Sequence, residues 1–176
     1  MRLSALRHIV ESVVALARPN RVTVLGSSSL LATAPQLGEP GGPLEMTFDA
    51  DLLVEPCDEQ LAAVLHEAIG EGSLFAQRTG YYADLLRTSI VETLPPGWEQ
   101  RLVAVPETPK TVALAAADLL VVKLKAGRAK DLELCRTVLR AGIVAEAELR
   151  ERLEATPLNE HEMFSAYRNF TAVLNR

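Results

Sequence analysis

A stretch rich in proline and glycine, residues 34–46, constrains the fold of this chain more than any other feature. It holds three prolines and three glycines in thirteen residues. Proline lacks the amide hydrogen that a helix interior or a central strand needs, so the stretch predicts a loop. The regular elements must therefore lie on either side of this loop, and each flanking segment contains the pattern of a short strand.

The segment before the loop predicts a strand, a turn and a helix in succession. Residues 21–25 are a short β-branched run that ends at Gly26. Three serines, residues 27–29, follow the glycine and are suitable caps for a helix that begins near Leu30.

The segment after the loop predicts a strand with an acidic face. Apolar and polar residues alternate over 47–54, which places Phe48, Ala50 and Leu52 on one face. Asp49 and Asp51 then share the other face, with Cβ atoms roughly 7 Å apart at the ~3.3 Å rise of a strand.

The rest of the chain predicts a strand-containing half followed by helices, and hence an α+β fold. We expect the sheet-bearing core with an N-terminal helix to cover 1–110. A helical part, 111–176, is expected to pack on it as one compact unit, with a boundary near Pro106–Pro109. Periodicity predicts helices over 3–17, 59–69, 112–126, 128–141, 145–155 and 159–174, and strands over 74–76, 81–86, 89–91 and 101–105.

Composition excludes several classes of protein. The chain has 176 residues and is 48% hydrophobic, but no apolar run reaches the ~18–20 residues that cross a bilayer. Charged residues interrupt the N-terminal segment, so we expect no secretory signal peptide. Two cysteines form neither a disulfide framework nor a ligand cluster, which favours the cytoplasm. A net charge of −5 argues against a sequence-independent nucleic-acid coat.

Charge is segregated along the chain. Residues 22–77 contain nine acids and no Lys or Arg, whereas residues 121–140 contain six Lys or Arg and two acids. One acidic and one basic region together can hold a cation and a polyanion. Solvated helix faces of either sign would give the same pattern, so the two interpretations stay open.

The first group of residues with chemical potential joins Gly26 and Ser27 to Asp49 and Asp51. A turn at a helix N-terminus offers backbone N–H groups and hydroxyls to phosphate oxygens. Two carboxylates on one strand face can share divalent metals, and Mg²⁺ typically takes one or two carboxylates plus substrate phosphates. Phosphoryl or nucleotidyl transfer needs this combination. Each piece alone is more often structural, either a helix cap or a solvated strand edge.

The second group lies between Asp118 and Asp131. Lys123 sits among apolar residues, so its ammonium either reaches solvent or is held by an acid. Cations beside a metal site would neutralise a triphosphate. The structural alternative is that Asp118 caps a helix and that Arg128 and Asp131 form an ordinary surface pair.

In this order the motifs resemble the minimal nucleotidyltransferase-like proteins of the polymerase-beta superfamily. They are most similar to abortive-infection toxin nucleotidyltransferases and to a related uncharacterised bacterial family. The resemblance spans about residues 22–140, and stretches around Tyr81-Tyr82 and Leu94–Leu102 share it. It implies a mixed β-sheet flanked by helices, with a helical C-terminal part. The motifs are Gly26-Ser27, Asp49-Ala-Asp51 and Lys123-Leu-x-Ala-x-Arg128-x-Lys-Asp131.

The resemblance also implies residue roles. Gly26, Ser27, Lys123, Arg128 and Asp131 would bind the nucleotide, with Asp131 orienting Lys123 or the substrate. Asp49 and Asp51 would hold Mg²⁺ or Mn²⁺. A third carboxylate on a later strand, for which Asp84 is the candidate, would activate the acceptor. The gap from Gly26 to Asp49 is longer than the compact family spacing, and it crosses the Pro/Gly loop.

The function expected from this resemblance is transfer of a nucleoside monophosphate from a nucleoside triphosphate to a hydroxyl. The acceptor would be RNA, such as tRNA, or a protein, in a toxin–antitoxin or defence setting with a cognate antitoxin. The alternative is a catalytically silent module that keeps the fold and binds a partner or regulates it. We assign no role to the three histidines, and we expect Cys135 and Trp98 to be structural.

Overall fold

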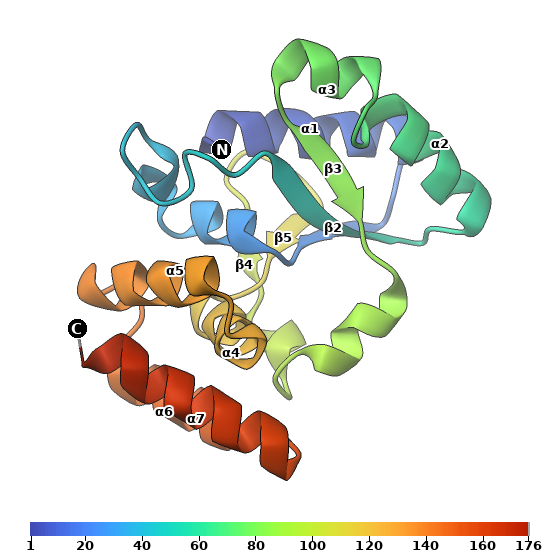
Figure 1. Ribbon diagram of the computed structural model, residues 1–176. Coiled ribbons are helices and arrows are strands. Elements are labelled where there is room, and N and C mark those ends of the chain that lie inside the picture. The colour runs from blue at the N-terminus through green and yellow to red at the C-terminus, as the bar shows by residue number, and fades with distance from the viewer. Residues whose placement is uncertain (176) are drawn as a thin grey trace. The chain divides into compact units, whose positions relative to one another are not determined.

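The computed structural model describes residues 1–175 and shows an α+β fold (Figure 1). A five-stranded mixed sheet has flanking helices, and further helices follow toward the C-terminus, as the sequence predicts. The chain divides into two compact units. Unit 1 comprises Met1–Ile90 and Leu102–Leu114 and contains the sheet, and unit 2 comprises Val91–Arg101 and Ala115–Arg176.

The sheet has the strand order β3-β2-β1-β5-β4. β1 (Arg21–Val24) pairs antiparallel with β2 (Asp49–Glu55) on one side and parallel with β5 (Thr111–Ala113) on the other. β2 also pairs in parallel with β3 (Tyr82–Leu85), and β4 (Val103–Ala104) pairs antiparallel with β5. The Pro/Gly loop thus connects two antiparallel neighbours.

The two faces of β2 differ as its alternating sequence predicts. Residues that alternate along a strand share a face, and paired residues on adjacent strands do the same. On one face of β1, β2 and β3 the side chains are apolar and buried; these are Val22, Val24, Ala50, Leu52, Val54 and Ala83. Asp49 and Asp51 lie on the opposite face. Phe48 precedes β2 and is exposed, so the strand begins two residues later than the predicted range of 47–54.

Three α-helices belong to unit 1. α1 (Leu3–Ala17) buries one apolar stripe and contacts α2 (Glu59–Ile69), which in turn contacts β3. Asp58 caps α2 as predicted, because its Oδ1 accepts a 2.8 Å hydrogen bond from the Leu61 amide. α3 (Leu74–Thr79) is a short helix capped by Ser73.

Four α-helices belong to unit 2, and α4 is the one that contacts the other three. Most of its residues are buried, as expected for a helix packed on several sides. A capping box between Asn159 and Glu162 fixes the start of α7. The bounds are α4 Ala116–Ala126, α5 Ala129–Arg140, α6 Glu146–Glu154 and α7 Glu160–Leu174.

Three predicted elements are wrong. Residues 74–76 belong to α3, since Ser73 supplies a helix cap, and residues 89–91 lie in a 3₁₀ helix, Thr88–Thr93. Residues 111–113 form β5, where helix was expected. β5 is too short to show a period of its own, and pairing with β1 defines it.

The serine turn also differs from its prediction. A 3₁₀ helix, Ser27–Ala32, follows Gly26, and no side chain caps it. The Pro/Gly loop is irregular apart from a second 3₁₀ helix, Pro35–Gly38. Among residues 1–175 no helix combines the length and the apolar character that a membrane crossing requires.

Candidate functional site

Three aspartates from two neighbouring strands lie on one face of the sheet. Asp49 and Asp51 alternate along β2, and Asp84 on β3 is in register with Asp51. Adjacent strands are about 4.8 Å apart, so the three carboxylates project from one small area of the sheet. We call this area the acidic face. Asp49 and Asp51 are half-buried and Asp84 is exposed, which leaves the acidic face open to small solutes.

The turn at Gly26 lies directly against Asp51. The amide of Leu25 donates a 2.9 Å hydrogen bond to the Asp51 carbonyl, which extends the β1–β2 pairing by one residue. A Cβ atom on Gly26 would lie 1.5 Å from Oδ2 of Asp51. The backbone φ of −84° is open to any residue. Glycine is therefore required for space, because any side chain would displace the Asp51 carboxylate.

Buried hydroxyls follow this glycine. Ser28 and Ser29 are each 1% exposed, and their Oγ atoms find no hydrogen-bond partner among residues 1–175. The Thr23 hydroxyl on β1, on the same side of the sheet as Asp51, is likewise buried and unpartnered. An unsatisfied buried hydroxyl costs about 1–3 kcal/mol, so three beside one turn indicate a locally polar interior. Ser27, the predicted phosphate ligand, is half-buried.

Tyr82 is a fourth residue on the acidic face. It is in register with Asp49, and alternation along β3 places it on the same side as Asp84. Burial raises the pKa of the Tyr82 phenol, and the charges of Glu71, Asp49, Asp84 and Asp51 raise it further. The Tyr82 hydroxyl therefore lies within the field of four carboxylates.

Asp49 and Asp51 are the residues of the acidic face that could hold a metal ion. Across residues 1–175, no three His, Cys, Asp or Glu side chains form a group that could hold a metal ion. Asp49 and Asp51 alone still match the number of protein carboxylates that Mg²⁺ commonly takes when phosphates supply other ligands. The Asp51 carboxylate packs against Gly26 and occupies the space that a side chain at position 26 would need. Asp84 is then available as a base and is not required as a ligand.

The predicted basic motif forms a buried ion cluster in unit 2. Nζ of Lys123 lies 2.9 Å from Oδ1 of Asp131, and Nε of Arg128 donates to Oδ2. Burial alone would raise the pKa of Asp131, but hydrogen bonds from Arg128 and Lys123 outweigh it and lower that pKa. Lys123 is therefore held by an acid, and Asp131 orients it. The predicted surface pair is wrong in one respect, because Asp131 is buried.

Asn169 on α7 contacts the end of α4 that carries Lys123. Nδ2 of Asn169 donates a 2.8 Å hydrogen bond to the Leu124 carbonyl, and both are buried. Gly127 ends α4 with φ +64° and has Asn169 at contact distance. Cys135 on α5 is fully buried, and burial, followed by the charge of Asp131, raises its thiol pKa to about 12. Its predicted structural role fits this environment.

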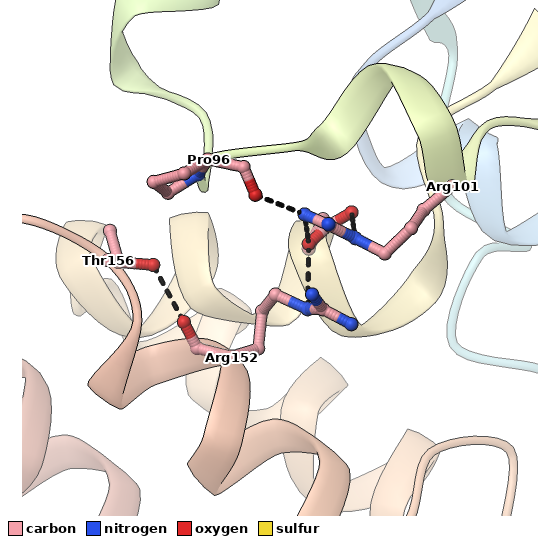
Figure 2. A network of polar contacts seen from close by, with 5 residues as sticks. Pro96, Arg101, Arg152 and Thr156 are labelled. Atoms are coloured by element: carbon pink, nitrogen blue, oxygen red, sulfur yellow. Dashed lines mark hydrogen bonds and ion pairs between the residues drawn. The ribbon is translucent and has the colours of Figure 1, made fainter.

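A second buried cluster in unit 2 surrounds Asp118 (Figure 2). Asp118 is in the first turn of α4 and fully buried, and the helix has no side-chain cap. Arg101 donates two 2.9 Å hydrogen bonds to its carboxylate, and Nε of Arg152 lies 3.1 Å from Oδ1. Arg101 also donates to the Pro96 carbonyl. The cluster ties residues 91–101 and α6 to α4, and Asp118 does not cap the helix as the structural alternative supposed.

The structure therefore divides the predicted site residues into two groups. Unit 1 brings Gly26, Asp49, Asp51 and Asp84 together, and unit 2 brings Lys123, Arg128 and Asp131 together. Neither Tyr82 nor the partners of Asp118 were predicted as site residues from the sequence. Alternation would have found Tyr82, because it is two residues from Asp84 on a predicted strand.

Comparison of the chain with protein-family models, curated proteins and solved structures finds no match.

Proposed function

We propose that the protein is a Mg²⁺-dependent nucleotidyltransferase. It would transfer a nucleoside monophosphate from a nucleoside triphosphate to a hydroxyl and release pyrophosphate. The observation that carries the proposal is the acidic face: Asp49 and Asp51 alternate on β2, and Asp84 on β3 is in register with Asp51. The turn at Gly26, whose backbone lies directly against the Asp51 carboxylate, supports it.

Each residue of unit 1 has a role in this proposal. Asp49 and Asp51 would hold Mg²⁺ or Mn²⁺, which would supply charge stabilisation to the triphosphate. Gly26 and Ser27 would offer backbone N–H groups and a hydroxyl to phosphate oxygens. Asp84, the most exposed of the three aspartates, accepts the proton of the attacking hydroxyl.

The roles of Lys123, Arg128 and Asp131 in nucleotide binding are part of the proposal as well. Lys123 and Arg128 both pair with Asp131, but Lys123 is buried whereas the Arg128 side chain is 60% exposed. We therefore assign phosphate contact first to Arg128 and orientation to Asp131. RNA such as tRNA, or a protein, is the proposed acceptor, and a cytoplasmic toxin–antitoxin or defence setting with a cognate antitoxin follows from the resemblance alone.

A silent module is the second candidate function. Two observations favour it: across residues 1–175 no three-acid metal group forms, and the basic motif pairs internally. In that case the fold would bind a partner without transferring nucleotide.

Labelling separates the two functions. Protein is incubated with cell extract, Mg²⁺ and each of the four nucleoside triphosphates labelled at the α-phosphate, and RNA and protein fractions are counted. We expect label in one fraction that falls at least tenfold for Asp49→Asn/Asp51→Asn. Glu59→Gln/Glu67→Gln, which changes two exposed acids of α2 in the same acidic region, is the charge-matched control and should label like wild type. Equal labelling by all three proteins would favour the silent module.

A further inference from the structure

Tyr82 lies on the same face of the sheet as the three aspartates of the acidic face. Its backbone is in register with Asp49 across the β2–β3 pair, and Asp84 follows two residues later on the same side of β3. The side chain is partly exposed. A triphosphate bound through a divalent metal at Asp49 and Asp51 would therefore lie beside the strand that carries Tyr82.

Resting on the proposed nucleotidyl transfer, we propose that Tyr82 is an acceptor within the chain itself, so that the protein nucleotidylates its own tyrosine. The phenolic oxygen forms a bond to the α-phosphorus of a nucleoside triphosphate. The bond from that phosphorus to the pyrophosphate oxygen breaks, and the phenolic proton passes to the Asp84 carboxylate. The products are a tyrosyl phosphodiester and pyrophosphate, and no group is oxidised or reduced.

Other hydroxyls near the acidic face are poorly placed as acceptors. Those of Thr23, Ser28 and Ser29 are almost fully buried and closed to a triphosphate. Tyr81 is adjacent in sequence, but its hydroxyl lies 2.8 Å from Nδ1 of His8, in an aromatic cluster with Phe75. Tyr82 combines exposure with a position on the same face as the proposed base. Modification there would occupy the acidic face and so limit further turnover.

The test uses the purified full chain alone. It is incubated with Mg²⁺ and each α-labelled nucleoside triphosphate, and the modified residue is located by tandem mass spectrometry of peptides. We expect label on Tyr82, a loss of at least tenfold in Tyr82→Phe, and wild-type labelling in Tyr81→Phe. Labelling should follow first-order kinetics with a rate constant independent of protein concentration. Circular dichroism shows that both variants are folded, and equilibrium dialysis with a non-hydrolysable triphosphate shows that Tyr82→Phe still binds nucleotide.

The outcomes separate this inference from the proposed function. Self-labelling that persists in Tyr82→Phe, or that maps to another residue, overturns the inference and leaves the proposed function standing. The same holds if wild type labels an extract acceptor but never itself. If wild type labels neither itself nor any extract component, both the inference and the proposed function fail.

Discussion

Gly26 shows how a single missing side chain shapes the acidic face. Its φ is one that any residue adopts, so the constraint is contact with the Asp51 carboxylate and not backbone strain. A methyl group there must push that carboxylate aside. The position of the Asp51 oxygens therefore depends on glycine at position 26.

We predict that Gly26→Ala destabilises the protein by about 1–3 kcal/mol through overpacking. Asp51→Ala removes the two atoms nearest to the added Cβ, so the cost of Gly26→Ala should fall by at least half in that background. Urea unfolding of the four proteins measures this coupling as a double-mutant cycle. Additive costs would show that Gly26 and Asp51 are independent.

The ionisation of Asp131 makes the stability of the folded protein depend on pH. Its pKa is lowered in the folded protein, so its ionisation stabilises the fold above the ordinary value of about 3.9. That stabilisation disappears as the pH falls through the lowered folded pKa. The cluster therefore favours the folded state at neutral pH and loses this contribution in acid.

The free energy of unfolding of the Asp131→Asn variant should be about 3–5 kcal/mol lower than that of wild type at pH 7, because Lys123 is left buried without a counter-charge. Its stability should also depend less on pH below about pH 4 than that of wild type. Unfolding measured from pH 2 to 7 checks both effects. Parallel pH curves for the two proteins would contradict the account of Asp131.

At the scale of elements, Asp118 joins three segments of unit 2 that are distant in sequence. Arg101 belongs to the stretch before the sheet's last two strands, and Arg152 belongs to α6. Both arginines meet a carboxylate with no exposure to solvent. Removal of that charge leaves two guanidinium groups in each other's field.

We predict that Asp118→Asn lowers the free energy of unfolding by about 3–5 kcal/mol, which is the range for breaking a buried ion pair. Glu133→Gln breaks the pair with Arg136, in which the Glu133 side chain is 65% exposed, and should cost no more than about 1 kcal/mol. Thermal or urea unfolding of the two variants makes the comparison. Similar losses in both would mean that burial adds nothing to the Asp118 cluster.

The sequence predicts elements well where local signals define them. Asp58 caps α2 and Asn159 starts α7, and both helices have the expected bounds within about a residue. β5 has no such signal, because its three residues become a strand only through pairing with β1. For the acidic face, alternation places Asp49 beside Asp51. The register of Asp84 depends on how β3 returns beside β2, which no local pattern specifies.

At the scale of the whole molecule, many charged side chains of the acidic and basic regions pair with protein groups and are not left for a ligand. Among the nine acids of residues 22–77, four have structural roles as a cap or in pairing: Glu39, Glu45, Glu55 and Asp58. Most of the basic residues in 121–140 also have acidic partners within unit 2; these include Lys123, Lys125, Arg128 and Arg136. Net charge is thus a poor guide to where ligands bind, and the acidic face is the more specific feature.

We propose that the acidic face, and not the whole acidic region of residues 22–77, holds the metal and the nucleotide. Paramagnetic Mn²⁺, added in small amounts with a non-hydrolysable triphosphate, tests it through broadening of assigned backbone amide signals in NMR spectra. The account predicts selective broadening at Gly26, Asp49, Asp51 and Tyr82, and its loss in Asp49→Asn/Asp51→Asn. Broadening centred on the exposed acids of α2, or unchanged in the double variant, would contradict it.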